Sequence, residues 1–195
     1  MPRRSSEYIE TRRDQLLAGA RRAFAEHGYD GTTVALLERE LGVTRGAIFN
    51  YWPNKLAIFM ELAERDAVDI TEQTELLARG PAAVVEDLLA RARADREWFG
   101  VYLEATRVIR RDPELWARWE QRSQAAGERM GEVVRDWQRQ GMVRDDVTAD
   151  DVLVLIFTLL DGIVLQVATS PQPSFEDYVR LPGLVADALA PPPSV

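Results

Sequence analysis

The stretch GVTRGAIFNYWPNK, residues 42–55, decides the fold because it predicts a helix too short to be stable alone. The expected helix runs from Arg45 to about Tyr51, with Gly46 in its first turn. An isolated helix of fewer than about 12 residues is marginal in water, and an interior glycine costs about 1 kcal/mol relative to alanine. The helix therefore needs support from neighbouring elements, and the glycine suits a face that a partner's surface approaches closely.

Two helices are predicted before this short one. The first is expected from about Ser6 to His27, because apolar residues recur at helical spacing and HGYDGTT then supplies a glycine. Thr33 caps the second, Val34 to Leu41, and Gly42 makes the turn that follows. Apolar residues of these helices are expected to pack behind the short helix and leave its front free. This order is the helix-turn-helix plan, whose last helix lies in the DNA major groove.

The remaining segments also predict helices. Proline, glycine and capping residues separate them, and no segment shows the alternation of a strand. Asp112 and the TADD sequence at 148–151 are cap signals, and a bend is expected near Pro182. The helices are expected at residues 55–77, 82–94, 98–110, 113–141, 149–168 and 175–190.

The sequence therefore predicts an all-α fold of two domains. Residues 1–54 are expected to form an N-terminal arm and a three-helix, homeodomain-like helix-turn-helix domain. Residues 55–190 are expected to form a helical domain for ligand binding and dimerisation, and the tail 191–195 is expected to be disordered.

The segment VLVLIFTLLDGIVLQVA, within 149–168, is apolar all round its axis. Such a helix needs cover on every side, and a second subunit would supply it. We therefore expect a homodimer through helices 149–168 and 175–190. The most apolar run, 152–160, is shorter than a bilayer span, so no membrane association is expected.

Composition excludes several classes of function. The chain has no cysteine and one histidine, His27, which excludes disulfides, thiolate metal sites and imidazole clusters. No nucleophile stands with a base and no glycine-rich loop could hold a phosphate, so we expect no catalytic residues, metal, cofactor or enzyme activity. The net charge of −8 is uneven, since residues 1–55 carry nine Arg/Lys against seven Asp/Glu. With no signal peptide at the N-terminus, a cytoplasmic protein is expected.

The residues AFAEHGYDGTTV and GVTRGAIFNYWPNK resemble the N-terminal domain of TetR-family transcriptional regulators over about residues 8–60. The resemblance implies a DNA-binding head and a helical body that binds a small molecule and dimerises. In the family, the start of the second helix, the recognition helix and the lysine that opens the fourth helix touch DNA. The DNA contacts implied here are Thr32, Thr33, Thr44, Arg45, Gly46, Ala47, Asn50, Tyr51 and Lys55.

The residue types suggest roles for these contacts. Arginine can pair with guanine and asparagine with adenine, so Arg45 and Asn50 are candidates for base readout, with phosphate contact as the alternative. Tyr51, Thr33 and Lys55 are expected to bind backbone phosphates.

Three positions depart from the family pattern. Phe49 stands where the family commonly has tyrosine, and Trp52 replaces the usual phenylalanine and is expected only to fill more core. Glu38 stands where a small residue is usual, and it would need a partner such as Arg45 or access to solvent. The pairing LLERELG with TRGAIF is similar to the aconitase-repressor subgroup.

The resemblance places a ligand cavity among aromatic residues of the middle helices, although an aromatic stripe is also typical of a core. The predicted ligand-binding residues are Trp98, Phe99, Tyr102, Arg107, Trp116, Trp119 and Met130.

The function expected is a homodimeric, ligand-responsive repressor that binds a palindromic double-stranded DNA operator and is released by a small-molecule effector. Its two recognition helices would lie about 34–36 Å apart. The alternative is a helical ligand-binding or interaction protein with a non-functional DNA head.

Overall fold

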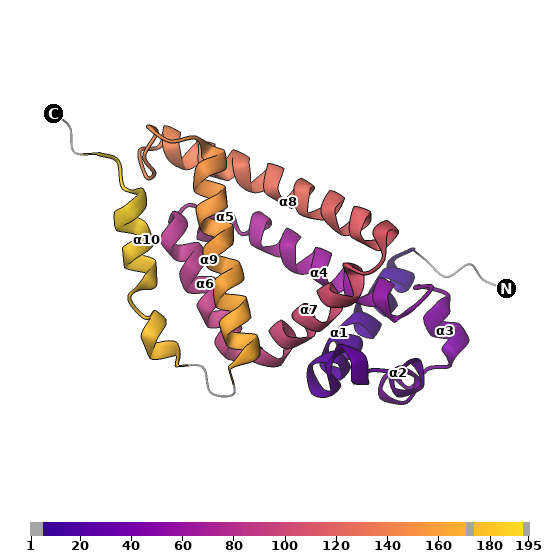
Figure 1. Cartoon of the computed structure of the whole chain (residues 1–195). Helices are drawn as coiled ribbons and strands as arrows, with labels where there is room; N and C mark the ends of the chain where they lie inside the picture. Colours follow the sequence, from indigo (N-terminus) through magenta and orange to yellow (C-terminus); the bar gives the residue numbers. More distant parts are fainter. Residues whose placement is uncertain (1–5, 171–173, 193–195) are drawn as a thin grey trace.

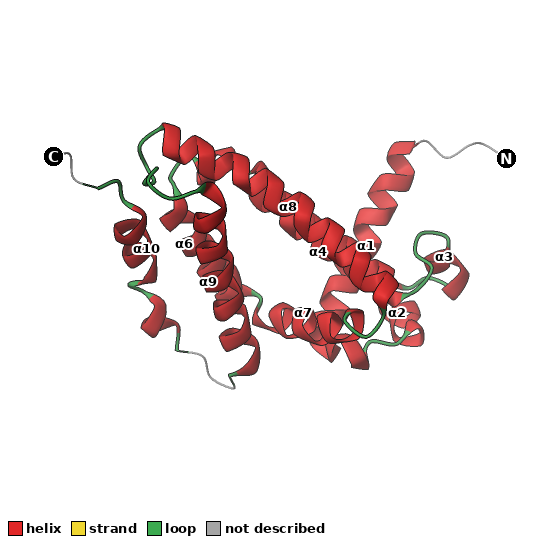
Figure 2. Ribbon diagram, turned by 45° about the horizontal axis from the view of Figure 1, so that its top comes forward, coloured by secondary structure: helices red, strands yellow, loops and turns green. Residues whose placement is uncertain are grey.

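The computed structural model describes residues 6–170 and 174–192, and this part of the chain contains helices and no strand (Figures 1 and 2). The predicted N-terminal arm (1–5) and the end of the predicted disordered tail (193–195) lie outside the described residues. The helices are α1 Ser6–Gly31, α2 Val34–Leu41, α3 Arg45–Phe49, α4 Lys55–Glu72, α5 Thr74–Leu77, α6 Pro81–Ala94, α7 Arg96–Ile109, α8 Pro113–Arg139, α9 Ala149–Thr169, the 3-10 helix η1 Phe175–Tyr178, and α10 Leu181–Leu189.

The helix boundaries follow the capping signals of the sequence. Gly28 interrupts α1 with φ 70° and ψ 170°, where the sequence predicted its end, and a short turn leads from it to α2. The side chains of Thr33, Thr44 and Asn54 each accept a hydrogen bond from the backbone N–H three residues later. Thr148 and Asp151 form a reciprocal capping box at the start of α9. These caps fix the starts of α2, α3, α4 and α9 as predicted.

Three predicted helices end differently. α3 ends at Phe49 instead of Tyr51, and the chain continues as a turn in which Tyr51 N–H donates to the Ile48 carbonyl. The prediction of one helix over 55–77 is wrong, because Gln73 is non-helical (ψ 73°) and α5 follows as a separate turn. The buried Trp137 indole donates to the Leu77 carbonyl at 2.6 Å and so holds that turn against the body.

The last predicted helix, 175–190, is also corrected. It consists of η1 and α10, and Pro182 lies in the first turn of α10. Proline has no backbone N–H to donate and its ring clashes with the preceding turn, so a helix begins readily at this point, whereas one that continued through it would be kinked or broken.

One hydrophobic core joins the N-terminal helices to α4, α7 and α8. Phe59 lies at its centre with no exposed surface. Its ring centroid lies 5.6–6.1 Å from those of four other aromatic residues, Tyr29, Trp98, Tyr102 and Trp119. This core crosses the predicted domain boundary at residue 54, so the head and the body share their apolar packing.

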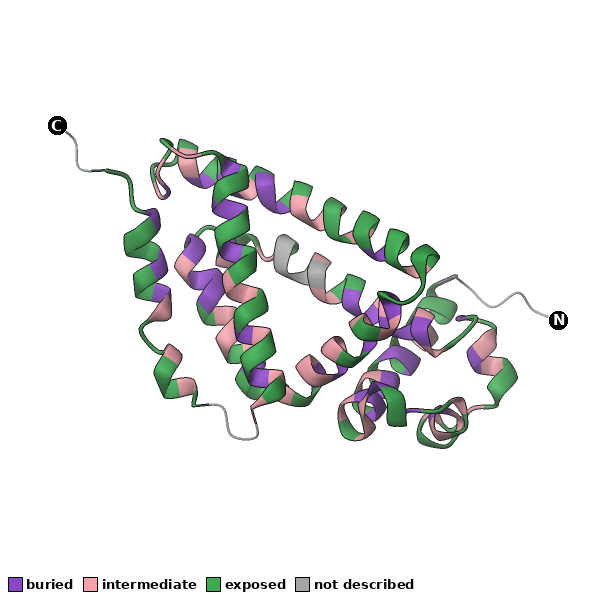
Figure 3. Cartoon of the chain, in the orientation of Figure 1, coloured by how far each residue is buried: buried purple, intermediate pink, exposed green. Residues whose placement is uncertain are grey.

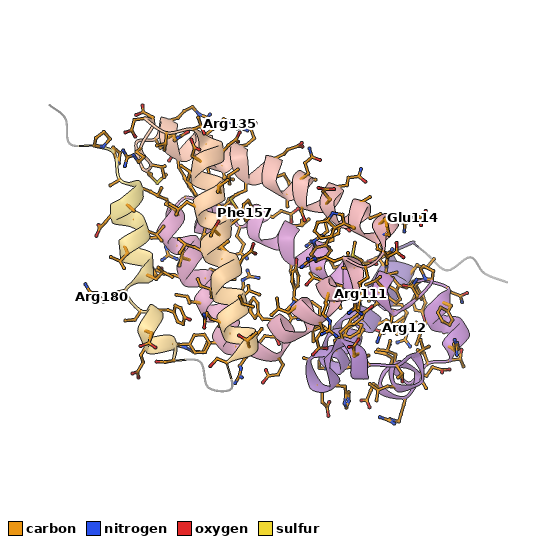
Figure 4. All side chains as sticks on the ribbon, viewed as in Figure 1. Arg12, Arg111, Glu114, Arg135, Phe157 and Arg180 are labelled. Atoms are coloured by element: carbon orange, nitrogen blue, oxygen red, sulfur yellow. The ribbon has the colours of Figure 1, made fainter. Side chains whose placement is uncertain are left out.

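A second core fills the body between α5, α6, α8, α9 and α10. α9 contributes its buried side, including Val152, Ile156, Ile163 and Val167. Its other side leaves Val154, Leu155, Phe157 and Leu165 exposed (Figures 3 and 4). The cover expected from a second subunit is therefore needed on one side of this helix only.

The prediction that no apolar segment is long enough to cross a bilayer is wrong, because α9 is longer than the run 152–160 on which the prediction rested. α9 has 21 residues, and its most apolar 18-residue stretch has a mean hydropathy of 2.3, which suffices by length and composition. The core helix of a soluble protein meets the same criterion, and the buried side of α9 belongs to the second core. An acidic residue, Asp161, also lies midway along its exposed side.

We expect Phe59→Ala to lower the free energy of unfolding by about 3–5 kcal/mol, because it removes the ring on which four others pack. Urea unfolding followed by circular dichroism measures this. The control Trp116→Phe changes a ring that is 40% exposed and should cost less than about 0.5 kcal/mol. An equal loss in the two variants would contradict the central place given to Phe59.

Candidate DNA interface

The short helix α3 is supported on one side and bare on the other. Ile48 packs into the first core beside Leu37 of α2, and both are buried. Arg45, Gly46 and Asn50 are exposed. α3 lies at the edge of the molecule farthest from α10 (Figure 1). The predicted free front of the helix is therefore present.

Two side chains from outside the helix satisfy the backbone at the start of α3. Thr44 accepts a hydrogen bond from Ala47 N–H at 3.3 Å, and Glu38 Oε1 accepts one from Arg45 N–H at 2.6 Å. A carboxylate at a helix N-terminus also interacts favourably with the helix dipole. Glu38 therefore pairs with Arg45, as predicted, but with its backbone N–H and not with its side chain. The Arg45 guanidinium remains available to bind a partner.

Phe49 supports Arg45 from one turn later in α3. The guanidinium carbon of Arg45 lies 5.1 Å from the centre of the Phe49 ring. A cation over an aromatic face is attracted by the ring's quadrupole and loses some rotamer freedom. The departure from tyrosine at this position removes a hydroxyl but keeps the ring that orients Arg45.

Within the described residues, no atom close to position 46 accounts for a glycine there. A Cβ built on Gly46 would meet nothing within 4 Å, and its φ is not in the left-handed region. Neither internal packing nor backbone conformation therefore requires glycine there. A partner that approaches the α3 backbone closely from outside would give a reason for glycine at this exposed position.

Trp52 does more than fill the core, which corrects the prediction made for it. Its indole N–H donates to Glu61 Oε2 of α4 at 2.6 Å, and Arg13 of α1 binds the same oxygen at 2.5 Å. Burial raises the pKa of Glu61, but hydrogen bonds from Arg13 and Trp52 and the charges of Arg13 and Arg65 outweigh it and lower the pKa overall. The end of the helix-turn-helix is thereby tied to α4.

Thr32, one of the predicted DNA contacts, has its side chain inside the protein. Thr32 has no exposed surface. Its hydroxyl donates to the carbonyl oxygens of Gly28 at 2.7 Å and Ala23 at 3.2 Å. The hydroxyl closes the end of α1, and its neighbour Thr33 is the exposed residue of the pair.

Lys55, the first residue of α4, is half-buried and engaged by the protein. Its Nζ donates to the carbonyl oxygen of Tyr29 at 2.6 Å and lies 3.5 Å from that of Asp30. It also lies 4.4 Å from the centre of the Tyr29 ring. Sequence reasoning missed these partners because nothing in the pattern places residue 55 beside residue 29.

The predicted ligand-binding residues do not line one cavity. Trp98, Tyr102 and Trp119 pack in the first core, and Phe99 and Met130 in the second. Arg107 lines a hollow of about 440 Å³ with His27 and Glu104, while Trp116 is exposed. The rings are mainly core residues, which was the alternative stated for them.

A cleft that the sequence did not predict lies where α1, α4 and α8 meet. Its volume is about 870 Å³, and its lining includes Arg13, Met60, Glu61, Leu115 and Arg118. The lining therefore combines apolar side chains of α4 and α8 with charged ones. Among the described residues, no group of three His, Cys, Asp or Glu is placed to hold a metal ion.

Comparison with known proteins places this geometry in a family. Residues 16–62 match the bacterial regulatory proteins of the tetR family, and residues 58–190 match the C-terminal domain of BetI-type transcriptional repressors. The chain belongs to the TetR family. The match confirms the fold class and the resemblance stated from the motifs.

Relatives of this TetR-family protein are named as transcriptional repressors, which agrees with the prediction that the chain is not an enzyme. It is 37% identical over 175 residues to the HTH-type transcriptional repressor Rv1474c of Mycobacterium tuberculosis, covering 89% of this chain and 91% of that protein. It is 36% identical over 169 residues to the HTH-type transcriptional repressor AcnR of Corynebacterium diphtheriae, covering 87% of each. The second relative agrees with the resemblance to the aconitase-repressor subgroup.

A solved TetR transcription regulator from Haloarcula marismortui has the same fold. Its TM-score is 0.74 at 21% identity, with 92% of this chain and 98% of that chain covered.

The contacts of the Glu61 carboxylate with Arg13 and Trp52 give a pH-dependent prediction. Because the folded-state pKa of Glu61 is lowered, its stabilisation is complete above the ordinary pKa of about 4.5 and is lost as pH falls through the lowered value. We expect Glu61→Gln to reduce the free energy of unfolding by about 1–2 kcal/mol at pH 7. The difference from the parent protein should shrink below about pH 4.5. Urea titrations from pH 3 to pH 7 measure it, and a difference independent of pH would contradict the assignment.

Proposed function

We propose that this protein represses transcription as a homodimer whose two α3 helices enter successive major grooves of a palindromic operator. The observation that carries the proposal is the exposed front of α3, with a glycine at position 46 that meets no neighbouring atom in the part of the chain that the structure describes. The repressor names of relatives that align over most of the chain support the same function.

The proposed DNA contacts divide by chemistry. Arg45, held over the Phe49 ring, and Asn50 face outward from α3 and are proposed to read base edges. Thr33 and Tyr51 are proposed to bind phosphates, which fixes the register of the head on the duplex. Thr44 and Ala47 flank Gly46 on the first turn of α3 and are proposed to lie close to the DNA backbone.

The exposed apolar side of α9 supports the proposed dimer. Val154, Phe157 and Leu165 recur along one stripe of the helix, and Leu184 of α10 is also exposed. A second copy that applied the same surface would bury these side chains symmetrically. The dimer would also set the separation of the two α3 helices.

The proposed switch is a small molecule in the helical body that changes the dimer's affinity for DNA. The first core gives a physical route, because Phe59 of α4 packs against both the head and α7. A ligand that favours a different position of α4 would shift the population of head orientations. The 870 Å³ cleft between α1, α4 and α8 is the candidate binding site for this small molecule. A repressor of this kind would act in the cytoplasm.

The experiment that tests the function is selection of random genomic DNA fragments by the purified protein, followed by sequencing. We expect enrichment of a palindromic site and an affinity that weakens with added salt. No enrichment, together with an affinity that does not depend on salt, would favour the alternative of an interaction protein with a non-functional head.

Gly46→Ala separates DNA contact from stability. Alanine should raise the stability of α3 by up to about 1 kcal/mol, since its methyl group meets open space. We expect DNA affinity to fall at least tenfold, because the methyl group would keep the backbone away from the duplex. Gel shift and thermal melting measure the two effects. Unchanged affinity in this variant would remove Gly46 from the interface.

The dimer surface is tested by Phe157→Asp. A carboxylate in the centre of an apolar interface would be desolvated without a partner, so we expect monomers at micromolar concentration. Analytical ultracentrifugation measures the oligomeric state. Trp116→Asp, on an exposed site of α8, is the control and should leave it unchanged. A Phe157→Asp variant that remains dimeric would contradict the location of the interface on α9.

A further inference from the structure

The turn between α1 and α2 sets where the helix-turn-helix begins. Gly28 leaves the helical conformation, and the Thr32 hydroxyl binds back to the Gly28 carbonyl at 2.7 Å. Thr33 then caps α2 directly. Any force that displaces residues 29–31 therefore displaces the start of α2. α2 in turn carries Glu38, which caps α3.

A side chain of the body holds this turn by its amides. Oε2 of Glu104, on α7, accepts hydrogen bonds from Tyr29 N–H at 2.7 Å and Asp30 N–H at 3.3 Å. The fit is close, since a Cβ added to Gly28 would lie 3.0 Å from the same oxygen. Hydrogen bonds from two amides to one carboxylate are charge-assisted and hold the turn firmly.

Lys55 holds the same turn by its carbonyls. Its ammonium group donates to the Tyr29 oxygen at 2.6 Å, lies 3.5 Å from the Asp30 oxygen and faces the Tyr29 ring. Burial lowers the pKa of Lys55, and the charges of Asp30 and Glu104 act in the opposite direction. A cation at the N-terminus of α4 opposes the helix dipole, so these carbonyl oxygens compensate for its position.

We propose that Lys55 and Glu104 form a clamp on residues 29–30, and that Lys55 positions the DNA-binding head instead of binding a phosphate. The three peptide groups between Gly28 and Gly31 are held by opposite charges: Glu104 of α7 binds two of their N–H groups, and Lys55 of α4 faces two of their carbonyl oxygens. The clamp connects the body to α2 without passing through the aromatic core. It replaces the expectation that Lys55 touches DNA, and it rests on the proposed function.

The charge and aromatic contacts of Lys55 explain why it would not be free for DNA. Of the three protons of its ammonium group, two can face the Tyr29 and Asp30 carbonyls, and the Tyr29 ring lies beside the group. Reaching a phosphate would release the turn that positions α2. The exposed residues of α3 do not hold another segment of the head in this way.

Salt dependence of DNA binding distinguishes the two roles of Lys55. The slope of log affinity against log salt falls in magnitude by about 0.9 for each phosphate contact that is lost. We expect Lys55→Met and Glu104→Ala each to weaken operator binding about tenfold with the slope unchanged. The double variant should be no more than about twofold weaker than the weaker single variant, since both residues act on one turn.

The control is Glu97→Ala, which removes an exposed carboxylate from the other end of α7 and should leave affinity unchanged. Glu104→Gln keeps an acceptor oxygen and should recover most of the affinity lost in Glu104→Ala. A reduced slope in Lys55→Met, or normal affinity in Glu104→Ala, would overturn the proposal.

Amide hydrogen exchange of the full-length protein tests the clamp without DNA. Exchange at Tyr29 and Asp30 should accelerate at least tenfold in Glu104→Ala and in Lys55→Met, with the helical circular dichroism retained. If the parent protein binds no DNA, the proposed function fails, and this exchange measurement still decides the clamp. Unchanged exchange at both amides would refute it.

Discussion

The recognition helix depends on apolar burial beneath it. α3 has five residues, and its own hydrogen bonds cannot compensate for the entropy of ordering them. Ile48 packed beside Leu37 supplies the missing stabilisation, and Glu38 and Thr44 satisfy the backbone at its start. Because α3 is stabilised from its buried side and from its N-terminal end, the residues on its exposed side are not needed for its stability. Their identities can therefore suit a binding partner.

The shared first core makes the head and body mechanically dependent. Phe59 contacts Tyr29 of the head and Trp98 of α7. Close-packed interiors do not deform continuously, so a displaced α7 must move its neighbours or lose contacts. A head joined only by a flexible linker would not respond to the body. In this protein, α7 is connected to the segment that precedes α2 in two ways, by the shared aromatic core and by the hydrogen bonds of Glu104 to residues 29 and 30.

The sequence was informative where the signal is local. Caps and glycines fixed the limits of α2 and the starts of α3, α4 and α9, because those signals act within three or four residues. It failed where the partner is distant in the chain. The break at Gln73, the Trp52 indole on Glu61 and the Lys55 ammonium beside Tyr29 depend on tertiary packing that periodicity does not encode.

The same reasoning explains why the predicted ligand-binding residues are divided between two cores. Aromatic spacing shows which side of a helix is buried, but a core and a cavity have the same apolar pattern. The burial of Thr32 has a related cause, since the side chain of a threonine beside a glycine turn can point outward or inward, and only the packed chain decides which.

Charge is distributed to fit this arrangement. Arg13 and Arg21 of α1 each meet a carboxylate of α4, Glu61 and Asp66, and Arg21 also binds Asp95 before α7. Three carboxylates from the acidic second part of the chain therefore pair with arginines of α1 at the junction of head and body. Arg45 is exposed on α3, where a polyanion would approach.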